Sequence, residues 1–262
     1  MPSGPRPPVA LVTGASRGIG TAIAVALAAR GVRVALHYHK HRAAADAVLA
    51  RLPAGGHAIV GADLADPAAT FAMWDEVTAR LGPTDIVVNN AGVYVEHSPL
   101  TTDYAAWQDV WQRTLATNLV GPANLSLLAA QSMAARAVPV DAHFGRGRIV
   151  NVSSRGAFRG EPDAPAYGAS KAGLNAFSQS LARAVAVRAV YVYVIAPGWV
   201  ETEMAAAHLA GPDGASIVAQ HPMGRVNRVD EVANAVAYCA LDAPAAMTGS
   251  VIDVNGASYL RT

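Results

Sequence analysis

Short apolar runs alternate with longer amphipathic segments along nearly the whole chain of 262 residues. The runs have the length and composition of buried strands, and the intervals between them are rich in the small and apolar residues of packed helices. Strands separated by helices favour a parallel sheet, because each helix carries the chain back to start the next strand in the same direction. The pattern predicts an α/β fold, a doubly wound parallel sheet of about seven strands with helices on both faces.

The expected boundaries follow the apolar periods and the turn residues between them. Strands are expected at residues 9–12, 32–38, 57–60, 85–89, 148–152, 190–196 and 250–254. Helices are expected at residues 19–29, 43–52, 68–81, 104–136, 167–187 and 230–241. The Pro-rich residues 1–8 are expected to be a disordered lead-in, and residues 9–262 one domain. Residues 137–147 and 199–225 look like excursions, the second forming a lid at the edge of the sheet.

Composition disfavours several classes of protein. The formal net charge is +1 and charged residues make up 15% of the chain, so there is no general attraction to nucleic acid. Residues 1–8 lack the apolar core of a signal peptide, and the longest apolar stretch, residues 184–198, is too short to span a bilayer. The single cysteine, Cys239, cannot form an intrachain disulfide and fits a reducing compartment. We therefore expect a cytoplasmic protein with neither nucleic acid nor membrane as a partner.

A glycine-rich turn joins the first expected strand to the first expected helix, with the spacing Gly14-x-x-x-Gly18-x-Gly20. Glycine lets the backbone approach a pyrophosphate closely, and the helix N-terminus adds free amides and positive partial charge. The spacing is not the usual G-x-G-x-x-G, but its place in the first strand–helix unit indicates a dinucleotide site rather than a turn without a ligand. The contacts expected from this turn are Gly14, Ser16, Arg17, Gly18, Ile19 and Gly20.

The end of the second strand indicates which dinucleotide binds. An Asp or Glu at this point holds the ribose diol of NAD, whereas cations hold the 2′-phosphate of NADP. Residues 36–42 carry no carboxylate, and Tyr38, His39 and Lys40 lie there, near the expected position of Arg17. The sequence therefore predicts NADP(H) as the cofactor.

Two polar features beside this pocket have alternative interpretations. Asp63, followed by Leu64, is expected to accept a hydrogen bond from the adenine amino group, and the alternative is a carboxylate that caps a loop or helix. His37, His39 and His41 would share one face if the second strand continued, as metal ligands can. The neighbouring cations and the lack of a nearby acidic ligand disfavour a metal, so a phosphate-binding edge is expected there and no metal.

Tyr167 and Lys171 lie four residues apart in an expected helix, so the phenol and the ammonium project from one face. Lys171 and Lys40 are the only lysines in the chain, which indicates a need for a compact ammonium at this position. The ammonium is expected to lower the pKa of the phenol. Ser154 ends the fifth strand, at the edge where ligands bind. In the reduction of a carbonyl, Tyr167 can donate the proton, Ser154 can bind the oxygen, and Lys171 can hold the nicotinamide ribose.

Together these motifs resemble those of the short-chain dehydrogenase/reductase family over about residues 9–259. The resemblance implies a Rossmann-type catalytic domain and, within a helix, an asparagine that supports a proton-relay water. The implied catalytic tetrad is Asn118, Ser154, Tyr167 and Lys171. The residues implied to pack beside the adenine ribose are Asn90, Ala91 and Gly92. The implied nicotinamide contacts are Pro197, Gly198, Val200 and Thr202.

Within the family, the chain is most similar to the 3-oxoacyl-acyl-carrier-protein reductases and related NADPH carbonyl reductases. This similarity implies a small carbonyl or alcohol substrate, which acyl-carrier protein or coenzyme A can carry, and a homodimer or homotetramer. One alternative is a pteridine or quinone reductase, because residues 36–39 and the cation after them resemble the pteridine reductases, which carry an Asp at the position of Ser154. Another is a non-catalytic dinucleotide sensor, which the intact tetrad disfavours.

Some residues depart from the family pattern or extend it. Tyr191 and Tyr193 stand where the family has an Arg and an Asn, and we expect altered packing beneath the site. Arg155 and Arg159, which follow the catalytic serine, are expected to meet an acidic substrate or a phosphopantetheine arm. The side chains with which the lid is expected to line the site are Met204, Leu209, Ile217, Val218 and Met223.

Overall fold

A computed structural model describes residues 6–137 and 143–261 of the chain. In this part, seven parallel strands form one sheet in the order β3-β2-β1-β4-β5-β6-β7. The strands are β1 (Val9–Val12), β2 (Arg33–Tyr38), β3 (Ala58–Gly61), β4 (Ile86–Asn89), β5 (Gly147–Val152), β6 (Val190–Pro197) and β7 (Val251–Val254). The predicted doubly wound sheet is confirmed, and each strand lies within one residue of its predicted boundaries.

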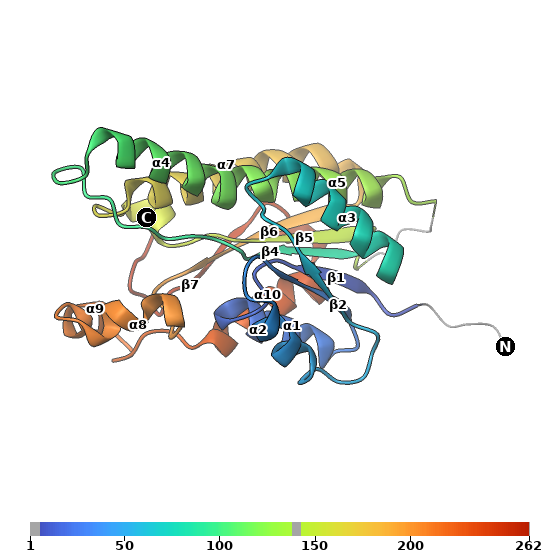
Figure 1. The fold of residues 1–262 in the computed structure, drawn as a ribbon. Helices are drawn as coiled ribbons and strands as arrows, with labels where there is room; N and C mark the ends of the chain where they lie inside the picture. The colour runs from blue at the N-terminus through green and yellow to red at the C-terminus, as the bar shows by residue number, and fades with distance from the viewer. Residues whose placement is uncertain (1–5, 138–142, 262) are drawn as a thin grey trace.

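Helices cover both faces of the sheet. They are α1 (Gly18–Ala28), α2 (Arg42–Leu49), α3 (Pro67–Leu81), α4 (Tyr104–Leu115), α5 (Gly121–Ala134), α6 (Gly156–Arg159), α7 (Pro165–Val185), α8 (Glu203–Ala210), α9 (Gly214–Ala219) and α10 (Val229–Leu241). Three short helical turns are η1 (Ala116–Val120), η2 (Ala186–Arg188) and η3 (Ala245–Met247). Figure 1 shows α3, α4, α5 and α7 on one face of the sheet and α1, α2 and α10 on the other.

The strands are apolar throughout because both of their faces are covered. In β1, Val9 and Leu11 pack in the cluster that contains residues of α3 and α5, whereas Ala10 and Val12 pack in the cluster of α1 and α10. All four side chains are fully buried. This alternation divides the core into two layers, one on each side of the sheet.

The point where the chain changes its winding direction positions the site. Strand β1 pairs with β2 on one side and with β4 on the other, so the chain winds outward to β3 and then crosses back to β4. Such a reversal opens a crevice at the carboxyl ends of the strands, because the connections on either side leave in opposite directions. The turn that follows β1 and the loop that follows β4 both begin at this crevice.

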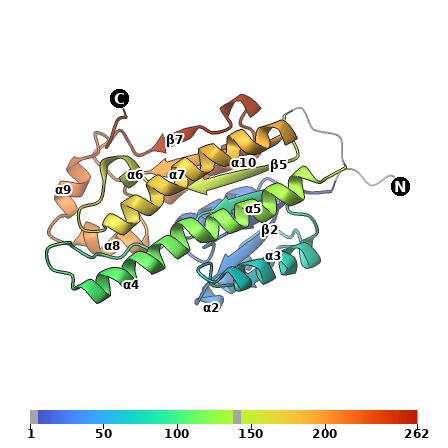
Figure 2. The same cartoon turned by 90° about the horizontal axis from the view of Figure 1, so that it is seen from above.

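Two segments differ from the predicted elements. The helix expected over residues 104–136 is interrupted by η1, a π-helical turn that contains Asn118, and it ends at Ala134. Residues 199–225 are not only loop, because they contain α8 and α9. In Figures 1 and 2 these two helices stand apart from the sheet, at the end of the molecule opposite to the N-terminus. Of the excursion expected at 137–147, residues 138–142 lie outside the described residues.

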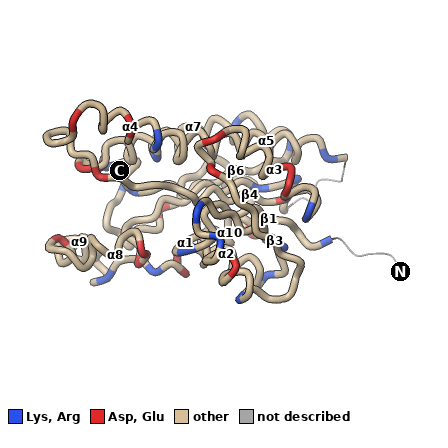
Figure 3. Tube along the Cα trace, viewed as in Figure 1, with Lys and Arg blue, Asp and Glu red and all other residues tan. Residues whose placement is uncertain are grey.

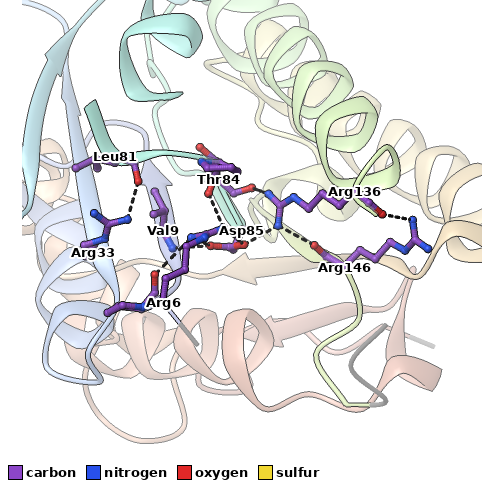
Figure 4. A network of polar contacts seen from close by, with 10 residues as sticks. Arg6, Val9, Arg33, Leu81, Thr84, Asp85, Arg136 and Arg146 are labelled. Atoms are coloured by element: carbon purple, nitrogen blue, oxygen red, sulfur yellow. Dashed lines mark hydrogen bonds and ion pairs between the residues drawn. The ribbon is translucent and has the colours of Figure 1, made fainter. Parts of the chain in front are cut away.

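A network of charged groups holds the amino-terminal ends of the strands together (Figure 4). Asp85, just before β4, accepts hydrogen bonds from Arg6, from the backbone N–H of Val9 and from Arg136 at the end of α5, at 2.8, 2.8 and 2.6 Å. Arg6 belongs to the lead-in expected to be disordered. The ion pair holds Arg6 in place, while residues 1–5 of the lead-in lie outside the described residues.

The two tyrosines that replace family residues in β6 pack beside an arginine. The guanidinium carbon of the fully buried Arg148 lies 5.7 Å from the centre of the Tyr193 ring, and its Nη1 donates to the carbonyl oxygen of Cys239 at 2.9 Å. Burial raises the pKa of the Cys239 thiol to about 11, so this cysteine is inert rather than nucleophilic. Arg148 and Tyr193 therefore form a buried contact between β5 and β6, and the expected change in packing relative to the family stays a prediction.

Basic and acidic side chains are mixed on both helical layers, as Figure 3 shows. A single-sign face of the kind that binds nucleic acid needs clustered cations. Among the described residues, no helix is both long and apolar enough to cross a membrane.

Candidate active site

A cavity of about 530 Å³ lies at the carboxyl ends of the central strands. It runs from the glycine-rich turn after β1 to Ser154 after β5 and to α8. Its lining contains every predicted cofactor and catalytic residue except Tyr38 and Asn118. Predicted residues from seven separate segments of the sequence therefore meet at one site.

The glycine-rich turn has the backbone geometry of a phosphate cradle. Gly14 and Gly18 have φ angles of 64° and 54°, values that side chains strongly disfavour. A Cβ on Gly20 would overlap the carbonyl oxygen of Gly14. Within the described residues no side chain caps the start of α1, so its first amides are free to bind an anion. The residues present thus fit the pyrophosphate of a dinucleotide.

His37, at the end of β2, supports this turn from beneath. Its Nδ1 accepts from the backbone N–H of Gly14 at 3.0 Å, and its Nε2 donates to the carbonyl oxygen of Ala62 at 3.1 Å. Burial lowers the pKa of His37 to about 4, so the imidazole is neutral. Both ring nitrogens are occupied, which is incompatible with the metal alternative in which His37, His39 and His41 act as ligands.

The pocket expected to hold the 2′-phosphate is exposed and carries cations from two segments. Arg17 lies 3.4 Å from Glu203, and His39 lies 3.6 Å from Asp63, so each of these two side chains has a weak surface partner that an anion can displace. Lys40 is exposed and lines the same cavity. Tyr38 does not line it, because its ring packs on Gly61, where an added Cβ would lie 2.9 Å from the Tyr38 hydroxyl.

Asp63 combines the two interpretations made from the sequence. Its Oδ1 accepts from the backbone N–H of Ala65 at 3.0 Å, which is the loop-capping role. The same residue, with Leu64, also lines the cavity where the adenine is expected. The adenine contact of Asp63 stays a prediction.

The predicted proton donor lies against the predicted oxygen-binding hydroxyl. Tyr167 stands in the first turn of α7, and its side chain is hydrogen-bonded to that of Ser154 at the end of β5. One helical turn further, Lys171 places its Nζ 5.8 Å from the centre of the Tyr167 ring. The same Nζ donates to the carbonyl oxygen of Val152 at 2.8 Å. The helix thus carries the phenol and the ammonium to the end of one strand.

Burial is the largest influence on the pKa values of Tyr167 and Lys171. Burial raises the pKa of Tyr167 to about 12, the hydrogen bond from Ser154 opposes this, and the negative charge of Glu161 adds to it. Burial also lowers the pKa of Lys171 to about 8. The expectation that Lys171 lowers the pKa of Tyr167 is therefore wrong for this state, because removal from water disfavours the phenolate more strongly than the neighbouring groups favour it.

Asn118 lies behind the cavity rather than in its lining. Its Oδ1 accepts from the backbone N–H of Val93 at 2.8 Å, and its Nδ2 donates to the carbonyl oxygen of Val93 at 2.9 Å. The amide is fully buried in η1. A Cβ on Gly92 would come within 3.3 Å of Asn118 Oδ1 and 3.4 Å of Lys171 Nζ. Asn118 thus fixes the loop after β4 beside Lys171, and its role with a relay water stays a prediction.

The lid begins at the predicted nicotinamide contacts. The side chain of Thr202 caps α8 by accepting from the N–H of Ala205 at 3.3 Å, and an added Cβ on Gly18 would lie 3.4 Å from Thr202 Cγ2. The start of the lid therefore packs against the glycine-rich turn. Of the five apolar side chains expected to line the site, only Met204 does so. Ile217 is buried within the lid, since α8 and α9 pack on each other.

The two arginines after the predicted catalytic serine hold the lid in place. Arg155 Nη2 and Arg159 Nη1 both donate to Oε1 of Gln220, just after α9, at 2.8 and 3.2 Å. Arg159 also lies 3.8 Å from Glu161. Among the described residues Arg155 Nη1 is buried without a hydrogen-bond partner, so the predicted contact of these arginines with an acidic substrate stays a prediction.

Several residues that line the cavity were not predicted from the sequence. They are Tyr94 in the loop after β4, Arg113 and Thr117 at the junction of α4 and η1, and His208 in α8. These positions follow no motif, since they reach the cavity only through the paths of loops and through the π-helical turn. A polar or aromatic residue soon after a parallel strand is the one local signal that could have indicated Tyr94.

The chain belongs to the short-chain dehydrogenase family, whose pattern matches residues 8–212. It is 38% identical over 252 residues to the 3-oxoacyl-[acyl-carrier-protein] reductase FabG of Escherichia coli (strain K12), covering 96% of this chain and 97% of that relative. It is also 38% identical over 259 residues to an uncharacterised oxidoreductase of Methylorubrum extorquens, covering 95% and 96%. The crystal structure of the angucycline C-6 ketoreductase LanV with bound NADP superimposes with a TM-score of 0.81 at 32% identity, covering 95% of this chain and 94% of that chain. The protein is therefore an oxidoreductase.

Proposed function

We propose that this oxidoreductase uses NADPH to reduce a ketone, such as a 3-oxoacyl thioester, to an alcohol, and that Tyr167 supplies the proton. The observation that carries the proposal is the hydrogen bond between Ser154 and Tyr167 in the cavity that starts at the glycine-rich turn. The names of the FabG and LanV relatives, one a 3-oxoacyl reductase and the other a ketoreductase with NADP, support this class of reaction.

Different residues of the chain bind the cofactor and position the substrate. NADPH, when bound, supplies the hydride for the carbonyl carbon. The turn with Gly14 and Gly18 binds the pyrophosphate, and Arg17, His39 and Lys40 bind the 2′-phosphate. Lys171 holds the nicotinamide ribose.

At the reacting carbonyl, Ser154 donates a hydrogen bond that positions the oxygen, and Tyr167 transfers its phenolic proton to that oxygen. The raised pKa of Tyr167, about 12, keeps this proton on the phenol at neutral pH, which suits an acid.

Ketone reduction is favoured over pterin reduction by Ser154. A hydroxyl can donate to a carbonyl oxygen, whereas the pteridine reductases that residues 36–39 resemble carry an Asp there. A pterin belongs in the substrate screen as the alternative.

Replacement of Tyr167 by Phe tests the proposal. The variant keeps the ring and its packing but has no proton to give, so turnover with NADPH is expected to fall by about 10²–10⁴-fold while NADPH binding persists. Tyr238→Phe is the matched control, because Tyr238 is an exposed ring on α10 outside the cavity. Near-normal turnover by Tyr167→Phe would refute the mechanism, and NADPH binding without turnover by the wild type would favour a sensor.

We also propose a cytoplasmic homodimer or homotetramer. Exposed apolar side chains on the α4 and α5 face support an interface there, namely Tyr104, Val120 and Leu127. Light scattering of the purified protein tests the oligomeric state, and a monomer at micromolar concentration would contradict it.

A further inference from the structure

Beyond the catalytic hydroxyls, the cavity has a wall of rings from three separate segments. Tyr94 follows β4, Trp199 follows β6, and His208 lies in α8, and we call these three residues the aromatic wall. All three line the cavity together with Ser154. The ring centres of Tyr94 and Tyr167 are 5.1 Å apart at an interplanar angle of 69°, so the wall begins at the proton donor.

His208 lies between the other two rings, edge to face with Tyr94 and tilted against Trp199. The centres of Tyr94 and His208 are 5.8 Å apart at 87°, and those of Trp199 and His208 are 5.4 Å apart at 53°. His208 Nδ1 also lies 3.7 Å from Glu96, which joins α8 to the loop after β4. These contacts lie in the range favoured by aromatic pairs and orient the rings around one space.

The aromatic wall is not part of the hydrophobic core. None of its three residues belongs to either core cluster of the described residues, and each is only partly buried. Large rings left partly exposed around a cavity present apolar faces to whatever enters it. The wall is therefore a surface available to a ligand.

The charged groups near the wall are mostly bound to other groups of the protein. An acyl group on a carrier protein or coenzyme A brings phosphate groups that need free cations. Arg155 is only 2% exposed and donates to Gln220, which Arg159 also does. Glu161 also lines the cavity, with its carboxylate 3.8 Å from Arg159, so the charges beside the substrate space are of both signs.

We propose that the aromatic wall selects a neutral, flat aryl ketone of two or more fused rings in preference to a linear 3-oxoacyl thioester. The ketone stacks beside Tyr94 and Trp199 with its oxygen at Ser154 and Tyr167. Reduction places a hydride on the carbonyl carbon and the Tyr167 proton on the oxygen, and the product is the secondary alcohol. This inference rests on the proposed function and names its substrate class.

Steady-state kinetics with NADPH and two substrates test the wall. The wild type is expected to have a higher kcat/KM for α-tetralone, a fused bicyclic aryl ketone, than for acetoacetyl-CoA. Trp199→Leu and Tyr94→Leu are expected to lower the ratio of the two values by about 10-fold, because each removes a stacking partner. Tyr238→Leu is the matched control, since Tyr238 is an exposed ring on α10 outside the cavity, and it should leave the ratio unchanged.

A wild-type preference for acetoacetyl-CoA, or an unchanged ratio in both wall variants, would overturn the inference and leave the proposed function intact. Turnover of neither substrate would instead count against the proposed function. Calorimetric titration of the protein with β-naphthol in the presence of NADP⁺ then tests whether the aromatic wall binds a fused aromatic ring system. Binding weakened about 10-fold by Trp199→Leu supports it, and no binding to the wild type overturns it.

Discussion

The Nδ1 atom of His37 accepts a hydrogen bond of 3.0 Å from the backbone N–H of Gly14 and so ties the second strand to the glycine-rich turn. Only an unprotonated Nδ1 can accept this bond, and the opposite nitrogen donates to Ala62. The neutral imidazole is therefore the form that holds the cofactor cradle in shape.

This contact makes stability depend on pH. The pKa of His37 is lowered from 6.5 to about 4 by burial, so the unfolded chain takes up a proton below about pH 6.5 while the folded chain resists until about pH 4. Stability is expected to fall as pH falls through this window, by up to about 3 kcal/mol. Urea unfolding followed across the window measures the loss. The His37→Gln variant should show a smaller loss, and His41→Gln, at an exposed position, should behave like the wild type.

Lys40 is expected to determine the preference of the protein for NADPH over NADH. Lys40→Ala removes an exposed cation of the phosphate pocket, so the Kd for NADPH should rise by about 10-fold and the Kd for NADH should stay the same. Quenching of tryptophan fluorescence during titration measures both. Arg42→Ala is the control, because Arg42 starts α2, lies 3.8 Å from Asp46 and does not line the cavity. Equal weakening of both cofactors by Lys40→Ala would contradict the phosphate site.

Asn118 is expected to act on turnover more than on cofactor affinity. Asn118→Ala removes both hydrogen bonds to Val93 and loosens the loop beside Lys171, and a displacement of about 1 Å can cost about 100-fold in rate. Stopped-flow measurement of turnover, with the Kd for NADPH determined in parallel, separates the two effects. Asn234→Ala, on the exposed side of α10, serves as the control. Unchanged turnover in Asn118→Ala would exclude a role for this amide.

Asp85 is expected to matter for stability and not for activity. Asp85→Asn weakens ion pairs to Arg6 and Arg136 and leaves the largely buried Arg136 without its counter-charge, which is expected to cost about 2–3 kcal/mol. The network lies at the amino ends of the strands (Figure 4), whereas the cavity lies at their carboxyl ends, so kcat should not change. Denaturant unfolding measures the loss of stability, and steady-state kinetics measure kcat. Asp46→Asn, in an exposed pair, should change neither.

Elements with a strong local signal could be predicted, and those set by distant contacts could not. The strand at Gly147–Val152 was placed within one residue because its apolar run has both faces buried. The helix expected over residues 104–136 was taken as continuous, since the π-helical turn at Asn118 has no sequence signature and depends on the hydrogen bonds of that amide to Val93. The contact of Arg155 with Gln220 was not predicted for a similar reason, because Gln220 is 65 residues away.

The sequence by itself determined the α/β sheet and the glycine-rich turn, because apolar periodicity and motif spacing are properties of neighbouring residues. The tetrad residues were predicted from the resemblance of the sequence motifs to those of the family. Only the tertiary structure decided the protonation of Tyr167 and Lys171, since burial depends on what packs around them. It also decided the aromatic wall, since Tyr94, Trp199 and His208 belong to three segments that meet only when the loops at the carboxyl ends of β4 and β6 fold back over one cavity.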